Sequence, residues 1–193
     1  MSKNNKVKYV AIAQRAKAKP AAGAAKRPPS PLGQMRDALA DGALHFLAFD
    51  GPGEAFSHPP SLGVSHPEHD AAGGRCLRLG NGKADAFSQG STEGYGIRLP
   101  DALEADASGR RVRVSVVARC AAGAGSRFAI AYSTNEVGNS GWQWRAAGPD
   151  WSVHAMDYDV PKMKDGKGDF VGLLPEPLGH PATEFLCLAI RLA

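Results

Sequence analysis

The sequence contains few cysteines, and their arrangement excludes two kinds of stabilised domain. Among its 193 residues, the cysteines are Cys76, Cys120 and Cys187. An odd number with no C-x-x-C spacing provides neither a disulfide framework nor a zinc-binding motif. Cys187 lies in an apolar stretch, where a buried thiol is expected. An ordinary hydrophobic core must therefore hold the fold together, and a chain of this length is able to bury one.

Long apolar runs are also missing. No segment is long enough to cross a membrane. The apolar stretch at residues 9–13 is too short to form the core of a signal peptide, and Gln14 and Arg15 end it. The sequence thus predicts no membrane span and no secretory signal. The expected location is the cytoplasm, or an assembled particle that is built there.

Catalytic signatures are absent as well. The GNGK segment at residues 80–83 lacks the P-loop spacing because Ala84 follows it, and GNSG at residues 138–141 does not match G-x-S-x-G. Two carboxylate pairs exist, but the sequence does not show the cleft that a glycosidase places between its two carboxyls. These pairs are Asp157 with Asp159, and Asp165 with Asp169. With no nucleophile beside a base, we expect a protein that is not an enzyme.

One group of residues resembles a set of metal ligands. It comprises His58, His66, Glu68, His69 and Asp70. Imidazoles bind zinc or copper, but neither helical nor hairpin spacing brings these residues together. The HPP and HPE segments are instead typical of proline turns. We therefore predict no metal site here and no cofactor.

Acidic residues are missing from the first 36 positions. This segment has nine Lys or Arg and no Asp or Glu, whereas the remainder has 14 basic and 19 acidic residues, so the two parts carry charges near +9 and −5. Residues 1–31 are rich in Lys, Ala and Pro and are predicted to form a flexible basic arm, because they cannot bury enough apolar surface to order alone. The alternating Val7, Tyr9 and Ala11 could add a strand to a neighbouring subunit. The arm could also meet an anionic surface or the acidic body, or remain a solvated tail.

The remainder of the chain has the pattern of an all-β protein. Val112, Val114, Val116 and Ala118 alternate with more polar residues, a period of two that is typical of a strand with one buried face. The 23 Gly and 14 Pro also suit a fold with many turns. Similar runs predict roughly nine strands, which lie near residues 44–49, 75–79, 94–99, 110–119, 127–133, 142–145, 151–160, 169–174 and 184–192. We predict an antiparallel β-sandwich, or jelly roll, over residues 44–193.

A short helix is predicted before this body, within a linker at residues 32–43. Ser30 is a favourable N-cap and Pro31 suits the first helical position. A helix ending near Ala40 would carry Leu32, Met35 and Leu39 on one face. Within the body, Leu186, Leu188, Ile190 and Leu192 are expected to share one face of the last strand, and residues 54–74 are expected to form a long loop.

Four segments of the body share the order of one known fold. They are GYGIRLP (94–100), GRRVRVSVVAR (109–119), RFAIAYS (127–133) and TEFLCLAIRL (183–192). Across residues 44–193 this order resembles the galactose-binding-like β-jelly roll of many carbohydrate-binding modules. The resemblance implies that the last strand closes beside the first, and that a structural calcium could lie between them. Asp50 and Glu54 could supply part of that site, but the last strand offers only Glu184.

An aromatic pair provides the candidate ligand site. Trp142 and Trp144 lie two residues apart, so in a strand both face the same way, with Gln143 and Arg145 opposite. Exposed indoles can stack on sugar rings or bases. Asn135, Glu136 and Asn139 in the preceding loop could hydrogen-bond hydroxyl groups, and Arg145 completes the candidate set. The alternative is that both tryptophans belong to the core.

Three functions remain open at this stage. The first is a non-catalytic module that recognises a glycan, with the arm as a tether. The second is a structural protein of a large assembly, such as a virion or a surface layer, in which the arm docks on a neighbouring subunit; a homo-oligomer is then possible. The third is sequence-independent nucleic-acid binding through the arm, against which the acidic body argues.

Overall fold

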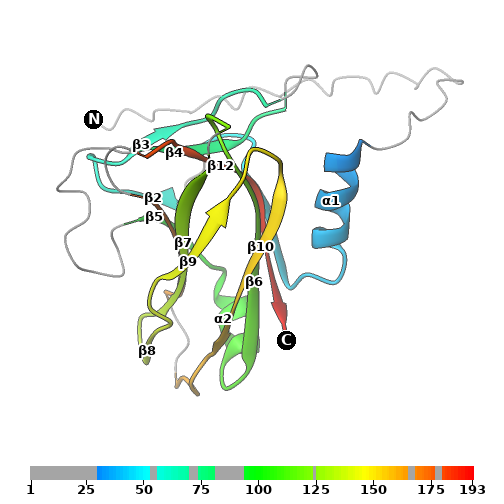
Figure 1. Cartoon of the computed structure of the whole chain (residues 1–193). Coiled ribbons are helices and arrows are strands. Elements are labelled where there is room, and N and C mark those ends of the chain that lie inside the picture. Colours follow the sequence, from blue (N-terminus) through cyan, green and yellow to red (C-terminus); the bar gives the residue numbers. More distant parts are fainter. Residues whose placement is uncertain are drawn as a thin grey trace, which may run out of the picture.

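The computed structural model describes residues 30–52, 56–69, 74–80, 94–123, 125–164, 168–176 and 180–193. In these residues, two antiparallel sheets pack face to face as a β-sandwich (Figure 1). The predicted all-β sandwich is therefore confirmed. The basic arm was predicted over residues 1–31, of which residues 1–29 lie outside the described residues; Ser30 caps helix α1 and Pro31 begins it. No described helix is both long and apolar enough to cross a membrane.

Each sheet contains six of the described strands. Sheet A has the order β10-β6-β12-β4-β3, with β1 also paired to β12, and sheet B has the order β2-β5-β11-β7-β8, with β9 also paired to β7. The last strand pairs with the first, as the resemblance implied. The element bounds are α1 Pro31–Ala40, β1 His45–Ala48, β2 Phe56–Ser57, β3 Gly63–Ser65, β4 Leu77–Gly80, β5 Tyr95–Arg98, α2 Asp101–Ala107, β6 Arg111–Cys120, β7 Ser126–Thr134, β8 Gly138–Asn139, β9 Gln143–Ala147, β10 Ser152–Asp159, β11 Phe170–Pro175 and β12 Thr183–Leu192.

The core lies between the two sheets and is built by alternation along the strands. In β6, Val112, Val114, Val116 and Ala118 all face this core, as the period of two predicts. The neighbouring strands contribute Tyr95 and Ile97 from β5, Phe128, Ile130 and Tyr132 from β7, and Val171 and Leu173 from β11. Alternation then places every second residue of β5, β7 and β11 on the outer face of sheet B.

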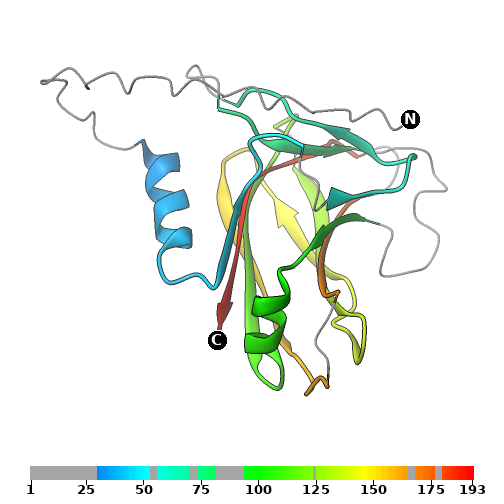
Figure 2. The same ribbon diagram turned by 180° about the vertical axis from the view of Figure 1, so that it is seen from behind.

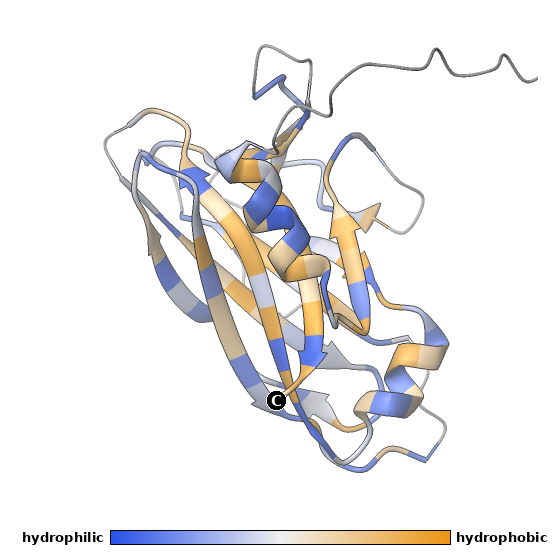
Figure 3. Ribbon diagram, turned by 90° about the vertical axis from the view of Figure 1, so that its right-hand side faces the viewer, coloured by the Kyte–Doolittle hydropathy of each residue, from blue (hydrophilic) through white to orange (hydrophobic). Residues whose placement is uncertain are grey.

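Helix α1 covers part of the outer face of sheet A. The Ser30 hydroxyl accepts a hydrogen bond from the Gly33 backbone N–H, so the predicted cap is present. The apolar face formed by Leu32, Met35 and Leu39 packs over Val117, Leu186, Cys187 and Ala189 (Figure 3). This second apolar cluster explains why Val117 is fully buried although it alternates with the core residues of β6.

The last strand does not follow the simple alternation expected from its sequence. The pairing of β12 with β6 shifts in register between Phe185 and Cys187, which marks a β-bulge. The bulge places Phe185, Leu188 and Ile190 in the core but turns Leu186 to the opposite face, under α1. The prediction that Leu186 shares a face with Leu188 and Ile190 is therefore wrong.

Several short elements were not predicted. Residues 54–74 contain β2 and β3, and the loop before the tryptophans contains β8. Helix α2 closes one end of the sandwich, where Leu103 and Ala107 join the core (Figure 2). Its start has a recognisable signal, because Pro100 stands at the N-cap and Asp101 and Glu104 place negative charge in the first turn.

Candidate functional site

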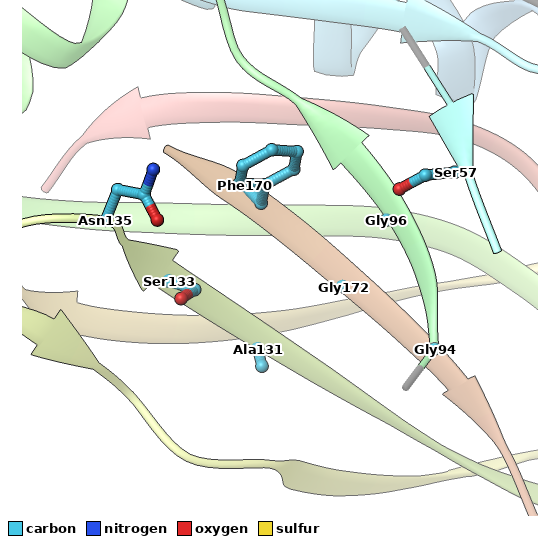
Figure 4. Close-up of a pocket in the computed structure, with 8 residues that line it drawn as sticks. All are labelled: Ser57, Gly94, Gly96, Ala131, Ser133, Asn135, Phe170 and Gly172. Carbon is cyan, nitrogen blue, oxygen red and sulfur yellow. The ribbon is translucent and has the colours of Figure 1, made fainter. Parts of the chain in front are cut away.

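The outer face of sheet B contains a pocket with a floor of very small residues. The pocket has a volume of about 150 Å³. Its floor is formed by Gly94 and Gly96 around β5, Ala131 on β7 and Gly172 on β11, while Phe170, Asn135, Ser133 and Ser57 stand around it (Figure 4). These strands pair side by side, and Gly172 lies directly opposite both Gly96 and Ala131. The floor of the pocket therefore carries no side chain larger than a methyl group.

The small residues also allow Trp142 to approach the sheet closely. A Cβ atom built on Gly172 would lie 2.7 Å from Cη2 of the Trp142 indole, and one built on Gly94 would lie 2.9 Å from the same atom. Distances this short do not occur for real Cβ atoms. The far edge of the indole therefore rests on the glycine backbone of sheet B, beside the pocket.

Trp144 lies on the same outer face of sheet B, in strand β9, which pairs with β7. It pairs with Ala129 of β7, which alternates with the core residues Phe128 and Ile130. The guanidinium of Arg127 lies 5.2 Å from the centre of the indole, a cation–π contact, and Arg127 also pairs with Glu176 at 3.4 Å. Trp144 is 37% exposed and neither tryptophan is part of the core clusters. The alternative that both tryptophans are core residues is contradicted.

The loop residues Asn135, Glu136 and Asn139, named from the sequence, have different roles in the structure. The Asn135 side chain lines the pocket. Glu136 accepts a hydrogen bond from the Lys164 backbone N–H at 2.8 Å, and so joins the β7–β8 loop to the segment after β10. Asn139 accepts a hydrogen bond from the Gly141 N–H at 2.9 Å and shapes the turn that leads to Trp142. The structure thus brings Asn135 to the pocket, whereas Glu136 and Asn139 support its loop.

Arg145 lies on the opposite face of β9 from Trp144 and contacts the other sheet. Its Nε donates a hydrogen bond to the Ala155 carbonyl oxygen at 2.9 Å, and Gln143 donates to the Asp157 carbonyl oxygen at 3.3 Å. Both acceptors belong to β10, the edge strand of sheet A. These side chains satisfy backbone groups that an edge strand otherwise leaves open. The structure therefore does not place Arg145 with the tryptophans.

Two buried carboxyl groups lie beneath the Asn135 loop. Glu104 and Asp169 are both fully buried. Glu104 accepts hydrogen bonds from the backbone N–H groups of Gly168 at 3.0 Å and Asp169 at 2.8 Å, and Asp169 accepts one from the Tyr132 hydroxyl at 2.8 Å. Burial, with a contribution from the Glu104 charge, raises the pKa of Asp169 to about 6 despite the hydrogen bond from Tyr132.

The outer face of sheet A carries charge pairs rather than a ligand site. Glu184 is buried between Arg78, whose Nε lies 3.0 Å from one carboxylate oxygen, and Arg119, whose Nε lies 2.7 Å from the other. Burial alone would raise the pKa of Glu184, but these hydrogen bonds leave it below its ordinary value. For the proposed calcium, Glu54 lies outside the described residues, and Glu184 is held by the two arginines. Nowhere in the described ranges do three or more His, Cys, Asp or Glu side chains gather closely enough to hold a metal ion.

The carboxylate pairs noted in the sequence do not form a catalytic couple in the described residues. Asp159 binds Arg111 and Asp157 binds Arg113, each through two hydrogen bonds. The hydrogen bonds from these arginines lower the pKa of both carboxyls, so neither is suited to act as a general acid. Both of these Asp–Arg ion pairs lie on sheet A, away from the pocket. In the other carboxylate pair, Asp165 with Asp169, Asp165 lies outside the described residues.

Sequence reasoning missed most of the pocket. The missed lining residues are Ser57, Gly94, Gly96, Ala131, Ser133, Phe170 and Gly172. A signal was present, because three strands place small residues on the face opposite their core residues: Gly94 and Gly96 around Tyr95, Ala131 and Ser133 around Tyr132, and Gly172 beside Val171. Recognising it required knowing that β5, β11 and β7 are neighbours.

Comparison with solved structures identifies the fold. Neither a protein-family model nor a curated protein sequence matches the chain. The structure is similar to the C-terminal family 22 carbohydrate-binding module of Clostridium thermocellum Xyn10B (TM-score 0.56, 17% identity, covering 80% of this chain and 95% of that one). It is also similar to a xylan-binding domain from CBM22 (0.53, 18%, 79% and 96%) and to the CBM22-1 xylan-binding domain of Paenibacillus barcinonensis (0.50, 15%, 78% and 94%). The chain therefore has the β-jelly-roll fold of carbohydrate-binding modules, as its four segments predicted.

Proposed function

We propose that this chain is a non-catalytic glycan-binding module that binds its ligand on the outer face of sheet B. One observation carries the proposal: the pocket floor of Gly94, Gly96 and Gly172, which carries no side chains, lies against the indole of Trp142, with Trp144 on the same face. Sugar rings combine apolar faces with hydroxyl edges. A surface that offers both indoles and polar groups matches these two features.

The individual groups have complementary tasks in this proposal. Trp142 and Trp144 provide apolar area for stacking, and the aromatic ring of Phe170 forms another side of the pocket. Asn135, Ser133 and Ser57 provide side-chain donors and acceptors for hydroxyl groups. The small floor admits a chain of sugars close to the backbone. A β-linked xylan chain, whose xylose units lack the hydroxymethyl group of hexoses, is the ligand that we propose; the xylan-binding domains of the same fold support this choice.

The proposal is tested by titrating the whole chain with xylohexaose and measuring binding by calorimetry and tryptophan fluorescence. We expect saturable binding that quenches fluorescence. The quenching should persist in Trp151→Phe, because Trp151 lies on sheet A under the Arg119 guanidinium. It should be much smaller in Trp144→Phe. If neither xylohexaose nor a panel of other neutral oligosaccharides binds at millimolar concentration, the proposal is wrong.

The alternative function, a structural protein of a virion or surface layer, gains no support from the structural comparisons described above. Of the large exposed apolar residues that the structure describes, Trp144 lies on the outer face of sheet B, whereas Leu44, Val153 and Leu192 lie on or next to strands of sheet A. We therefore propose a single function.

A further inference from the structure

The Glu104–Asp169 pair is a buried cluster whose hydrogen bonding is incomplete. Oε2 of Glu104 and Oδ1 of Asp169 are both buried without a hydrogen-bond partner in the described part of the protein. The other oxygens are engaged, since Oε1 of Glu104 accepts two backbone N–H groups and Oδ2 of Asp169 accepts the Tyr132 hydroxyl. Two buried carboxylates without a counter-charge are costly, and a proton on one of them removes half of the buried charge.

The groups that face Asp169 do not include a cation in the described residues. Helix α2 contributes Glu104, β7 contributes Tyr132, the β7–β8 loop contributes Glu136, and β10 contributes Tyr158. All four are acidic groups or phenols, and none of the described arginine, lysine or histidine side chains forms an ion pair with Asp169 or Glu104. The negative charge of the pair must therefore be relieved by a proton as the pH falls.

This cluster is directly connected to the pocket. Asp169 precedes Phe170, whose side chain lines the pocket. The Asn135 backbone N–H also interacts with the Asp169 carboxyl. In addition, a Cβ atom at Gly168 would lie 2.8 Å from Nδ2 of Asn135, so the backbone held by Glu104 packs tightly against a pocket side chain. Any movement of the pair is thus transmitted to Asn135 and Phe170 through single contacts.

We propose that the Glu104–Asp169 pair is a proton switch that strengthens glycan binding in mild acid and weakens it in mild alkali. This inference rests on the proposed function of the pocket. When the pair holds one proton, only one buried negative charge remains, and the cluster holds Asn135 and Phe170 in place. When both groups are ionised, their repulsion loosens this rim. The raised pKa of Asp169, about 6, places the change between pH 5 and pH 8.

The experiment measures the affinity of the whole chain for xylohexaose at pH 5 and pH 8, each in EDTA and in calcium. The ligand has no ionisable group in this range, so any change arises in the protein. We expect the dissociation constant to be about three- to tenfold lower at pH 5. Asp169→Asn replaces the carboxyl by a neutral amide of similar shape, as protonation does, and its affinity should be independent of pH and similar to the acidic value. Glu104→Gln is a second variant with the same expectation, and the exposed Asp150→Asn is the matched control that keeps the pH dependence.

The outcomes separate this inference from the proposed function. Equal affinity at pH 5 and pH 8 in the unaltered chain would overturn the switch and leave the glycan site standing. A pH dependence that survives in both Asp169→Asn and Glu104→Gln would do the same, because another group would then be responsible. A gain in affinity caused by calcium and not by protons would also overturn it. Absence of binding at both pH values, for xylohexaose and for the panel of neutral oligosaccharides alike, would overturn the proposed function itself, and the inference with it.

Discussion

The indole of Trp142 lies so close to Gly172 that no side chain fits between them. The separation of 2.7 Å between the indole Cη2 and a Cβ atom placed on Gly172 is shorter than any ordinary contact. Since the indole ring is rigid, a larger residue at position 172 forces the ring to move. The position of Trp142 therefore depends on a residue that is 30 positions away in sequence and that itself has no side chain.

We expect Gly172→Ala to displace Trp142 from the floor and weaken xylohexaose binding about tenfold. Loss of a central aromatic contact typically costs about 1–3 kcal/mol of binding free energy. Calorimetry measures the affinity, and a red shift of tryptophan emission reports the exposed indole. Gly148→Ala is the matched control, because a Cβ atom there meets nothing within 4 Å. Unchanged affinity and emission in Gly172→Ala would show that the indole does not need this floor.

Trp144→Ala separates a binding role from a structural one. Trp144 is 37% exposed and contacts Arg127 on the surface, so its removal should leave the melting temperature nearly unchanged. We expect it to weaken glycan binding by about 1–3 kcal/mol. A core tryptophan would behave differently, with a loss of roughly 3–5 kcal/mol of stability on truncation. Phe185→Ala, in the core, provides the comparison for such a loss of stability. If Trp144→Ala lowered the melting temperature as much as Phe185→Ala does, the surface role of Trp144 would be contradicted.

Glu184 should make the fold sensitive to strong acid. Its pKa is lower in the folded chain than its ordinary value of 4.5, so its ionised form stabilises the fold above that pH, and this stability is lost as the pH falls. Glu184→Gln removes the charge between Arg78 and Arg119 and should lower the free energy of unfolding at pH 7 by roughly 3 kcal/mol. Urea unfolding at pH 7 and pH 3 should show the two proteins converging in acid. The exposed Asp106→Asn serves as control, and a difference that persists at pH 3 would argue against the ion pair.

Arg191 fastens α1 to sheet A. Its Nη2 donates to the carbonyl oxygens of Ala38 at 2.6 Å and Leu39 at 3.0 Å, and also to that of Asp41, at the end of the helix where carbonyls have no helical partner. Arg191→Met should speed hydrogen exchange in α1 and lower stability by about 1–2 kcal/mol. Arg111→Met, which breaks an exposed pair with Asp159, should leave the stability and the exchange of α1 nearly unchanged. Equal exchange of α1 in both variants would contradict this role for Arg191.

The sequence predicted the buried residues correctly where a strand is buried on one face only. Alternation correctly identified Val112, Val114 and Val116 because these residues meet the core between the sheets. It was less informative at Val117 and Leu186, since α1 buries a second face that no period within a strand reveals. The bulge between Phe185 and Cys187 also broke the expected order, because the extra residue places Phe185 on the core face and Leu186 on the opposite one.

The candidate site could be predicted only in part, for a similar reason. Trp142 and Trp144 are conspicuous in the sequence, and their spacing is a local property. The pocket floor instead depends on the pairing of β11 with both β5 and β7, segments that are far apart in the chain. The contact of Glu104 with Asp169 likewise spans 65 positions. Such relationships follow from the fold and not from a local pattern.

Helix α1 and the pocket lie on opposite faces of the domain. The helix lies against the outer face of sheet A, whereas the pocket opens on the outer face of sheet B, so the thickness of the sandwich separates them (Figures 1 and 2). A polysaccharide lying along sheet B would not meet α1. Sheet B would then be occupied by the polymer while the α1 side of sheet A stayed uncovered.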